Sequence, residues 1–220
     1  MSFLFGILNY LEAARHCNVK RFVFASSGVP AGEVEPPIHE ELPPHPVSPY
    51  GASKLAGEGY CSAYFRTFGV ETVCLRFGNV YGPLSGKKDS VVAKFIKRAA
   101  EGLDLEIYGD GRQTRDFIYI DDLVSAVRLA ATVEKAAGET FQIATNHETT
   151  VYEMVRLLVP ALEDHGISNI KMKYGEKRQG DVMRNFSDTT KAQDVLGWEC
   201  REKLKTGLEK TVKWFLKDSG

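Results

Sequence analysis

The stretch Arg21-Phe22-Val23-Phe24-Ala25-Ser26 is a short apolar run that predicts a strand buried within a parallel sheet. The run Thr72-Val73-Cys74-Leu75-Arg76 predicts a second buried strand further along the chain. Between the two runs, Ser48 and Pro49 predict the N-cap and first turn of a helix, which we expect to end at Gly69. Strand, helix and strand in this order indicate an α/β fold with a doubly wound parallel sheet.

The pattern changes on either side of this unit. Before it, apolar residues from Leu4 to Ala14 recur at helical spacing and predict a helix. Beyond residue 80 the chain alternates short strands with amphipathic helices, one of which opens with the capping-box sequence Thr150-Val151-Tyr152-Glu153. We therefore expect residues 1–80 to belong to the sheet domain. Residues 81–220 should form mainly a smaller mixed α/β lobe, with some segments returning to the sheet. The expected strands of that second part are Leu105–Tyr108, Phe117–Ile120 and Thr140–Ile143.

Composition and charge narrow the class of partner. Of the 220 residues, 43% are hydrophobic and 26% charged, and the formal net charge is -1. This balance is that of an ordinary globular protein and argues against nucleic acid or a membrane surface as the main partner. No apolar run reaches the roughly 18 residues of a membrane span. The four cysteines form no Cys-x-x-Cys pair, which predicts reduced thiols and a cytoplasmic location.

Tyr50 and Lys54 stand four residues apart in the first turns of the predicted helix, so they share one helical face. A nearby ammonium favours the phenolate form of tyrosine and lowers the phenol pKa. Such a phenol can act as a general base close to neutral pH. The spacing alone leaves a second interpretation open, in which a surface tyrosine lies beside a solvated lysine.

Four segments in the same order extend the pattern around Tyr50. They are residues 22–27, 48–58, 75–83 and 108–122. Together they resemble the extended short-chain dehydrogenase/reductase family, and within it the NAD-dependent epimerase/dehydratases similar to UDP-glucose 4-epimerase. The resemblance implies a Rossmann-like sheet, NAD as cofactor and a nucleotide-diphosphate sugar as substrate. NAD would take the hydride, because no amino-acid side chain can accept one.

The resemblance assigns catalytic roles to three residues. Tyr50 matches the acid/base that takes the proton from a sugar hydroxyl. Lys54 matches the residue that tunes this phenol and binds the nicotinamide ribose, and Ser27 matches the hydroxyl that hydrogen-bonds the substrate oxygen. Ser26, together with Tyr50 and Lys54, is assigned to the cofactor site.

The resemblance also assigns a binding site for the nucleotide diphosphate. A guanidinium binds phosphate through paired hydrogen bonds, and a carboxylate accepts hydrogen bonds from ribose hydroxyls. Without the resemblance, Arg115 could instead pair with Asp116 at the surface, and the apolar members could be plain core. The assigned residues are Asn79, Leu105, Tyr108, Arg115, Arg178 and Asp181.

The family's glycine-rich Gly-x-x-Gly-x-x-Gly motif, which binds pyrophosphate at a helix N-terminus, does not occur in these 220 residues. The first residues already match the helix that precedes the serine strand. We therefore expect a partial sheet that lacks the family's first strands. Its exposed edge would need to be covered by a homo-oligomer or by a partner chain.

The residues after the serine strand indicate the type of reaction. Gly28 and Val29 follow Ser27, where the dehydratases of the family carry Asp-Glu. With no acid there to expel water, the chain resembles a UDP-hexose 4-epimerase more than a dehydratase. Two alternatives stay open: a catalytically silent relative that binds nucleotide sugar or only self-associates, and a nucleotide-sugar reductase.

Two further residue groups carry expectations about structure. Asp121 and Asp122 precede an apolar helical pattern, and we expect one of them to cap that helix. Trp198 follows a predicted helix end at Gly197 and is expected to lie in the core.

Overall fold

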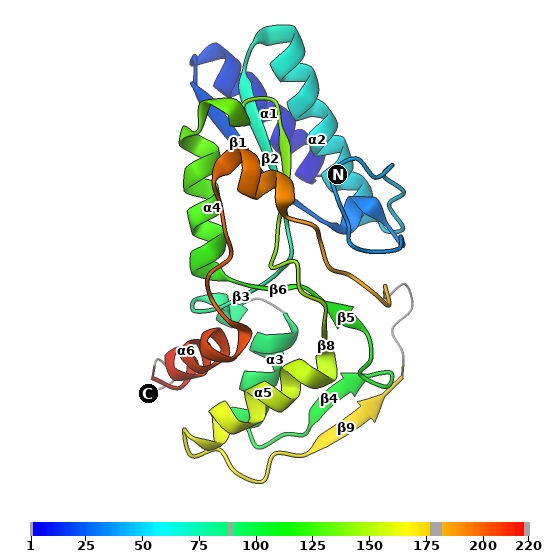
Figure 1. Ribbon diagram of the computed structural model, residues 1–220, viewed down its shortest axis with the longest axis vertical. Coiled ribbons are helices and arrows are strands. Elements are labelled where there is room, and N and C mark those ends of the chain that lie inside the picture. The colour runs from blue at the N-terminus through cyan, green and yellow to red at the C-terminus, as the bar shows by residue number, and fades with distance from the viewer. Residues whose placement is uncertain (1, 88–89, 177–181, 218–220) are drawn as a thin grey trace.

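The computed structural model describes residues 2–87, 90–176 and 182–217 (Figure 1). Its α-helices are α1 (Ser2–His16), α2 (Pro49–Phe68), α3 (Val91–Ala100), α4 (Ile120–Thr132), α5 (Val151–Glu163) and α6 (Leu204–Lys217). Its strands are β1 (Arg21–Ser27), β2 (Glu71–Phe77), β3 (Asn79–Tyr81), β4 (Leu105–Tyr108), β5 (Thr114–Arg115), β6 (Phe117–Tyr119), β7 (Thr140–Ile143), β8 (Thr149–Thr150) and β9 (Met172–Gly175). Short helical turns are η1 (Val29–Ala31), η2 (Ser85–Lys87), η3 (Glu134–Ala136) and η4 (Ala192–Leu196).

The sheet that positions the site consists of β1, β2 and β7 in that order, with both pairs parallel. One face packs on α1 and α2 through a cluster that contains Phe24, Cys74 and Leu11. The opposite face packs on α4 through a cluster that contains Leu75 and Phe141. Helices thus cover both faces of a parallel sheet, which confirms the predicted α/β class with a partial, doubly wound sheet.

Local signals explain where α2 and α5 begin. The Ser48 side chain accepts a hydrogen bond from the Gly51 N–H at 3.1 Å, so it caps α2 as predicted. Gly69, at φ 70°, ends that helix in the left-handed conformation that glycine adopts without steric cost. The predicted capping box at the start of α5 is present, with Thr150 and Glu153 bonded reciprocally.

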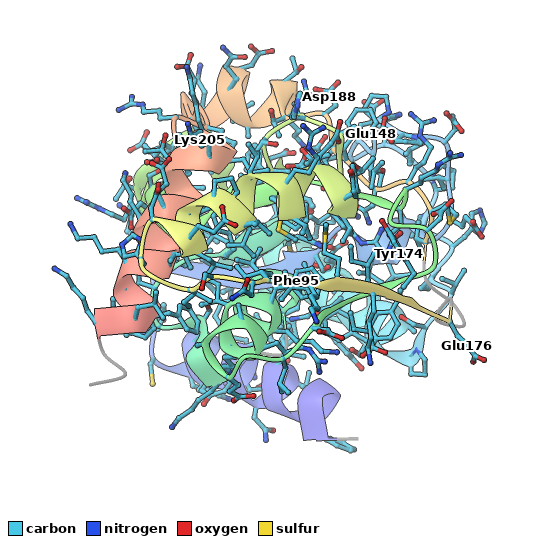
Figure 2. All side chains as sticks on the ribbon, turned by 90° about the horizontal axis from the view of Figure 1, so that it is seen from below. Phe95, Glu148, Tyr174, Glu176, Asp188 and Lys205 are labelled. Atoms are coloured by element: carbon cyan, nitrogen blue, oxygen red, sulfur yellow. The ribbon has the colours of Figure 1, made fainter. Side chains whose placement is uncertain are left out.

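The second part of the chain forms a lobe below the sheet in Figure 1, built on α3, α5 and α6. These helices share one core with β4 and β6, in which Phe95 (labelled in Figure 2) is 1% exposed. Two short strand pairs lie between sheet and lobe: β3 with β6, in parallel, and β5 with β8, antiparallel. Residues 79 and 115 line one cavity with Ser27, at the end of β1, and Tyr50, at the start of α2.

The prediction that Asp121 or Asp122 caps a helix is wrong. The N-cap of α4 is Tyr119, whose side chain makes no capping hydrogen bond. The Asp122 carboxylate instead accepts hydrogen bonds from the backbone N–H groups of Arg201 and Glu202, at 3.2 and 2.8 Å. Since these partners come from a distant segment, sequence spacing could not reveal them. The core position of Trp198 is confirmed, because it is 2% exposed.

Candidate active site

Tyr50 and Lys54 lie together in the first turns of α2, where that helix meets the end of β1. The Lys54 ammonium lies 5.6 Å from the centre of the Tyr50 ring and donates a hydrogen bond to the Ala25 carbonyl at 2.7 Å. Burial lowers the pKa of Lys54. Tyr50 itself is 55% exposed, so its phenol is accessible to a ligand. The geometry brings a cation to a phenol, as the Tyr-x-x-x-Lys spacing predicts.

The two serines at the end of β1 have different surroundings. Ser27 is half-buried, and its hydroxyl accepts a hydrogen bond from the Val29 N–H at 3.3 Å. Ser26 is 4% exposed and donates its hydroxyl to the Glu58 carboxylate on α2. The Ser26 side chain is therefore used to join β1 to α2. Because its hydroxyl is bonded to Glu58, Ser26 would contact a cofactor through its backbone N–H or carbonyl group.

Glu58 is also bound by Arg76 of β2, in a pair that sequence reasoning did not identify. Arg76 donates from Nε and Nη2 to the two carboxylate oxygens, at 2.9 and 2.7 Å. Burial alone would lower the pKa of Arg76, yet the hydrogen bonds to Glu58 raise it. Only their alignment across α2, β1 and β2 shows that Ser26, Glu58 and Arg76 form one buried polar cluster.

A single cavity of about 410 Å³ brings the predicted residues together. Its volume lies within the range of small-molecule sites. Five of the predicted residues line it: Ser27, Tyr50, Asn79, Tyr108 and Arg115. They come from β1, α2, β3, β4 and β5, so the cavity lies where the sheet and the lobe meet.

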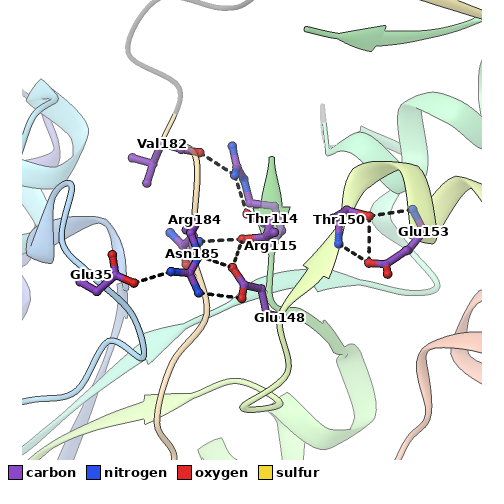
Figure 3. A network of polar contacts seen from close by, with 9 residues as sticks. All are labelled: Glu35, Thr114, Arg115, Glu148, Thr150, Glu153, Val182, Arg184 and Asn185. Atoms are coloured by element: carbon purple, nitrogen blue, oxygen red, sulfur yellow. Dashed lines mark hydrogen bonds and ion pairs between the residues drawn. The ribbon is translucent and has the colours of Figure 1, made fainter. Parts of the chain in front are cut away.

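Arg115 lines the cavity and also binds the backbone of Val182, the first described residue after positions 177–181 (Figure 3). Its Nη1 donates to the carbonyls of Thr114 and Val182, at 2.6 and 2.8 Å. Asp116 is not a surface partner of Arg115: it is 1% exposed and accepts hydrogen bonds from both the N–H and the hydroxyl of Thr145. Burial raises the pKa of Asp116, an effect that these hydrogen bonds partly oppose.

Lys94 of α3 is a cavity residue that sequence reasoning missed. Its ammonium donates to the Tyr108 hydroxyl at 2.9 Å and lies 5.0 Å from the centre of that ring. Lys94 and Arg115 therefore present two cations to the same cavity. In the sequence Lys94 is an isolated lysine between apolar residues of an amphipathic helix. Sequence spacing does not identify it, because its contact with Tyr108 forms only in the folded chain.

Three predicted binding residues stand apart. Leu105 is fully buried in the core of the lobe and does not line the cavity. Arg178 and Asp181 lie outside the described residues. The cavity thus joins the Tyr50 phenol, a serine hydroxyl and two cations, and its lining also includes the carboxylate of Glu106. These groups suit a substrate that carries both a reacting hydroxyl and a negative charge.

Comparison with known proteins agrees with this geometry. The model of the NAD dependent epimerase/dehydratase family matches residues 4–144. The chain is 37% identical over 216 residues to a putative UDP-glucose 4-epimerase of Methanocaldococcus jannaschii, covering 95% of this chain and 67% of that protein. The crystal structure of UDP-glucose 4-epimerase from Thermotoga maritima with UDP-glucose superposes with a TM-score of 0.90 at 38% identity, covering 98% of this chain and 69% of that one. UDP-glucuronic acid 4-epimerase of Bacillus cereus, in complex with UDP-glucuronic acid and NAD, gives a TM-score of 0.90 at 29% identity, covering 98% and 67%.

The chain spans about two thirds of the length of these relatives, and 62% of a Bacillus subtilis protein described as an uncharacterized UDP-glucose epimerase. Within the described residues, none of the helices combines the length and the apolar character needed to cross a bilayer. The family match covers more than half of the sequence, and the same residues superpose on solved epimerases. The chain therefore belongs to the NAD dependent epimerase/dehydratase family.

Proposed function

We propose that this chain carries the substrate-converting part of a nucleotide-sugar 4-epimerase that works on a UDP-hexose. The observation that supports the proposal most directly is the single cavity lined by Ser27, Tyr50, Asn79 and Arg115. The absence of a dehydratase acid after Ser27 favours epimerisation over loss of water. The relatives with a solved structure that share the fold include two 4-epimerases with UDP-sugars bound.

Tyr50 and Lys54 fit the nicotinamide ribose part of NAD. Lys54 donates to the Ala25 carbonyl and presents its ammonium 5.6 Å from the centre of the Tyr50 ring, and the Tyr50 phenol lines the cavity. Donors of this kind suit the hydroxyls of a nicotinamide ribose. The glycine-rich motif for the pyrophosphate does not occur in these residues. When bound, NAD supplies a reversible acceptor for hydride from a sugar carbon.

The chain's own residues would perform the rest of the reaction. Tyr50 removes the proton from the sugar 4-hydroxyl, helped by the positive charge of Lys54. Ser27 hydrogen-bonds the same oxygen as it becomes a carbonyl. Arg115 and Lys94 hold the diphosphate while the keto sugar turns. Tyr50 then returns the proton to the carbonyl oxygen, and the sugar carbon would regain its hydride from the bound cofactor on the opposite face.

The test is interconversion of UDP-glucose and UDP-galactose by the 220-residue chain with added NAD, followed by chromatography. We expect turnover in the wild type and a loss of about 10²–10⁴-fold in Tyr50→Phe, because only the hydroxyl that moves the proton is removed. Ser53→Ala, a change on the same helix outside the cavity lining, should retain the rate. Turnover at the wild-type rate in Tyr50→Phe would contradict the proposal.

A second candidate is a protein that binds nucleotide sugar without converting it. The cavity residues for the sugar nucleotide lie within the described part of the chain, which supports binding of that ligand. The NAD released from the purified, denatured chain separates the two. Near-stoichiometric NAD supports the epimerase, whereas UDP-glucose binding with no NAD, bound or taken up, supports the second candidate. A homo-oligomer or a partner at the sheet edge and a cytoplasmic location stay predictions.

A further inference from the structure

A second and larger cavity, of about 790 Å³, lies on another part of the lobe. Its walls come from β6, the segment between β7 and β8, α5, and the residues that lead into α6. None of the predicted catalytic or binding residues that the structure describes lines it. Among the described residues, Phe117 is the one that both linings share. The larger cavity is therefore separate from the candidate active site.

Positively charged side chains outnumber carboxylates in the lining of this larger cavity. Four cations line it, against two carboxylates: Arg156, Arg201, Lys203 and Lys205, with Glu153 and Glu202. Lys205 is seen at the first turn of α6, beside α5 (Figure 2). His147 adds a group that can also carry positive charge.

Both carboxylates are already bound by other groups. Glu153 accepts from the N–H and the hydroxyl of Thr150 in the capping box, each at 2.8 Å. Glu202 accepts from the Lys210 ammonium at 2.6 Å. Within residues 2–87, 90–176 and 182–217 the four cationic side chains make no hydrogen bond and no ion pair within 4 Å, although the charge of Arg156 contributes to lowering the pKa of Glu153. The lining therefore holds four cations against two carboxylates, an excess of two positive charges.

The segment that carries Arg201 and Lys203 is held in place. The buried Asp122 carboxylate accepts the N–H groups of Arg201 and Glu202, and the Trp198 indole donates to the Asp122 carbonyl at 2.9 Å. The cations thus project from a fixed backbone. Binding of a ligand then requires ordering of side chains only, which lowers its entropic cost.

The floor of the same cavity is apolar. Phe117 is 4% exposed, and Leu157 and Leu204 are half-buried beside it. A cavity of this size with an apolar floor and a few charged groups has the character of a small-molecule site. From these features we infer that the larger cavity binds a small organic phosphate, a dianion with an apolar or aromatic portion. A phosphate monoester carries a charge close to -2 at neutral pH, which matches the excess of two cations.

Phenyl phosphate is the simplest probe with both features, and isothermal titration of the 220-residue chain measures its binding. We expect Arg201→Gln/Lys203→Gln to weaken that binding by about tenfold or more, because two charge-assisted contacts are lost. The matched control, Lys20→Gln/Lys171→Gln, removes two exposed lysines outside both cavities and should leave binding unchanged. Benzoate, with a single charge, should bind more weakly than phenyl phosphate.

The same titration can overturn the inference. An equal loss in the control variant would show general attraction of anions by the protein surface. A loss confined to Arg115→Gln would place the probe in the candidate active site instead. Absence of phenyl phosphate binding by the wild type, or benzoate binding of equal strength, would contradict a site for dianions. Each of these outcomes is independent of whether the chain interconverts UDP-sugars.

Discussion

The two regions that meet at the candidate active site are held together in different ways. The junction of α2, β1 and β2 contains a buried ion pair, Arg76 with Glu58, in which both side chains are 8% exposed. The segment 182–185 is held by the exposed Arg184, which donates to Glu148 and to Glu35 (Figure 3). Both regions use arginine and glutamate, but only the buried pair would leave an uncompensated charge in the interior if one partner were removed. The junction beside the proton-transfer residues thus contains a desolvated ion pair, while the segment 182–185 depends on exposed pairs that salt weakens.

The largest expected effect is on the buried pair. Glu58→Ala should lower the free energy of unfolding by about 3–5 kcal/mol, because Arg76 would remain buried without its carboxylate. Chemical denaturation measures the change. Glu139→Ala is the control, since Glu139 pairs with Lys191 beside the same sheet and these side chains are 45% and 33% exposed. An equal loss of unfolding free energy in the two variants would show that burial of the ion pair does not determine its contribution to stability.

A smaller effect is expected from a change in packing at the same junction. A Cβ atom added at Gly57 would lie 2.5 Å from the Phe24 ring, so α2 could not approach β1 as closely. Gly57→Ala should cost about 1–3 kcal/mol of unfolding free energy. Gly59→Ala on the same helix meets nothing within 4 Å and should not destabilise the fold. If Gly57→Ala were as stable as Gly59→Ala, the close approach of helix and strand would be refuted.

The smallest expected effect belongs to the exposed pair. Arg184→Gln should lower Tm by no more than about 2 °C, and by less at high salt, because exposed ion pairs are screened. Hydrogen bonds from Arg184 lower the pKa of Glu148. This stabilisation is therefore complete above the ordinary carboxylate pKa of about 4.3 and is lost as the pH falls through the lower pKa of folded Glu148. Thermal melts of both proteins between pH 3 and pH 7 should converge at the acid end; a constant difference would contradict this assignment.

Sequence reasoning succeeded where the information is local. The cap at Ser48, the stop at Gly69 and the capping box at Thr150 each depend on a few neighbouring residues. The grouping of Ser27, Tyr50 and Arg115 in one cavity followed from the family resemblance, since these residues are far apart in the chain. Spacing alone would have left each of them with an ordinary surface or core role.

The missed features all depend on contacts between distant segments. Glu58 and Arg76 are paired through the packing of a helix on a sheet, and Asp122 binds a backbone turn near residue 201. Lys94 reaches the cavity because α3 packs beside β4. A charged residue on an amphipathic helix predicts solvent exposure, and only the tertiary structure shows which charges face a cavity instead.

One cavity gathers the phosphate-binding and proton-transfer groups, and titration of UDP-glucose into three variants tests this grouping. Arg115→Gln should weaken binding by about tenfold or more, while Tyr50→Phe should leave it nearly unchanged, because the phenol acts on the reacting hydroxyl. Arg184→Gln controls for loosening of the segment that Arg115 also holds, and it should bind as the wild type does. A wild type that does not bind UDP-glucose, or binding indifferent to Arg115, would contradict the account.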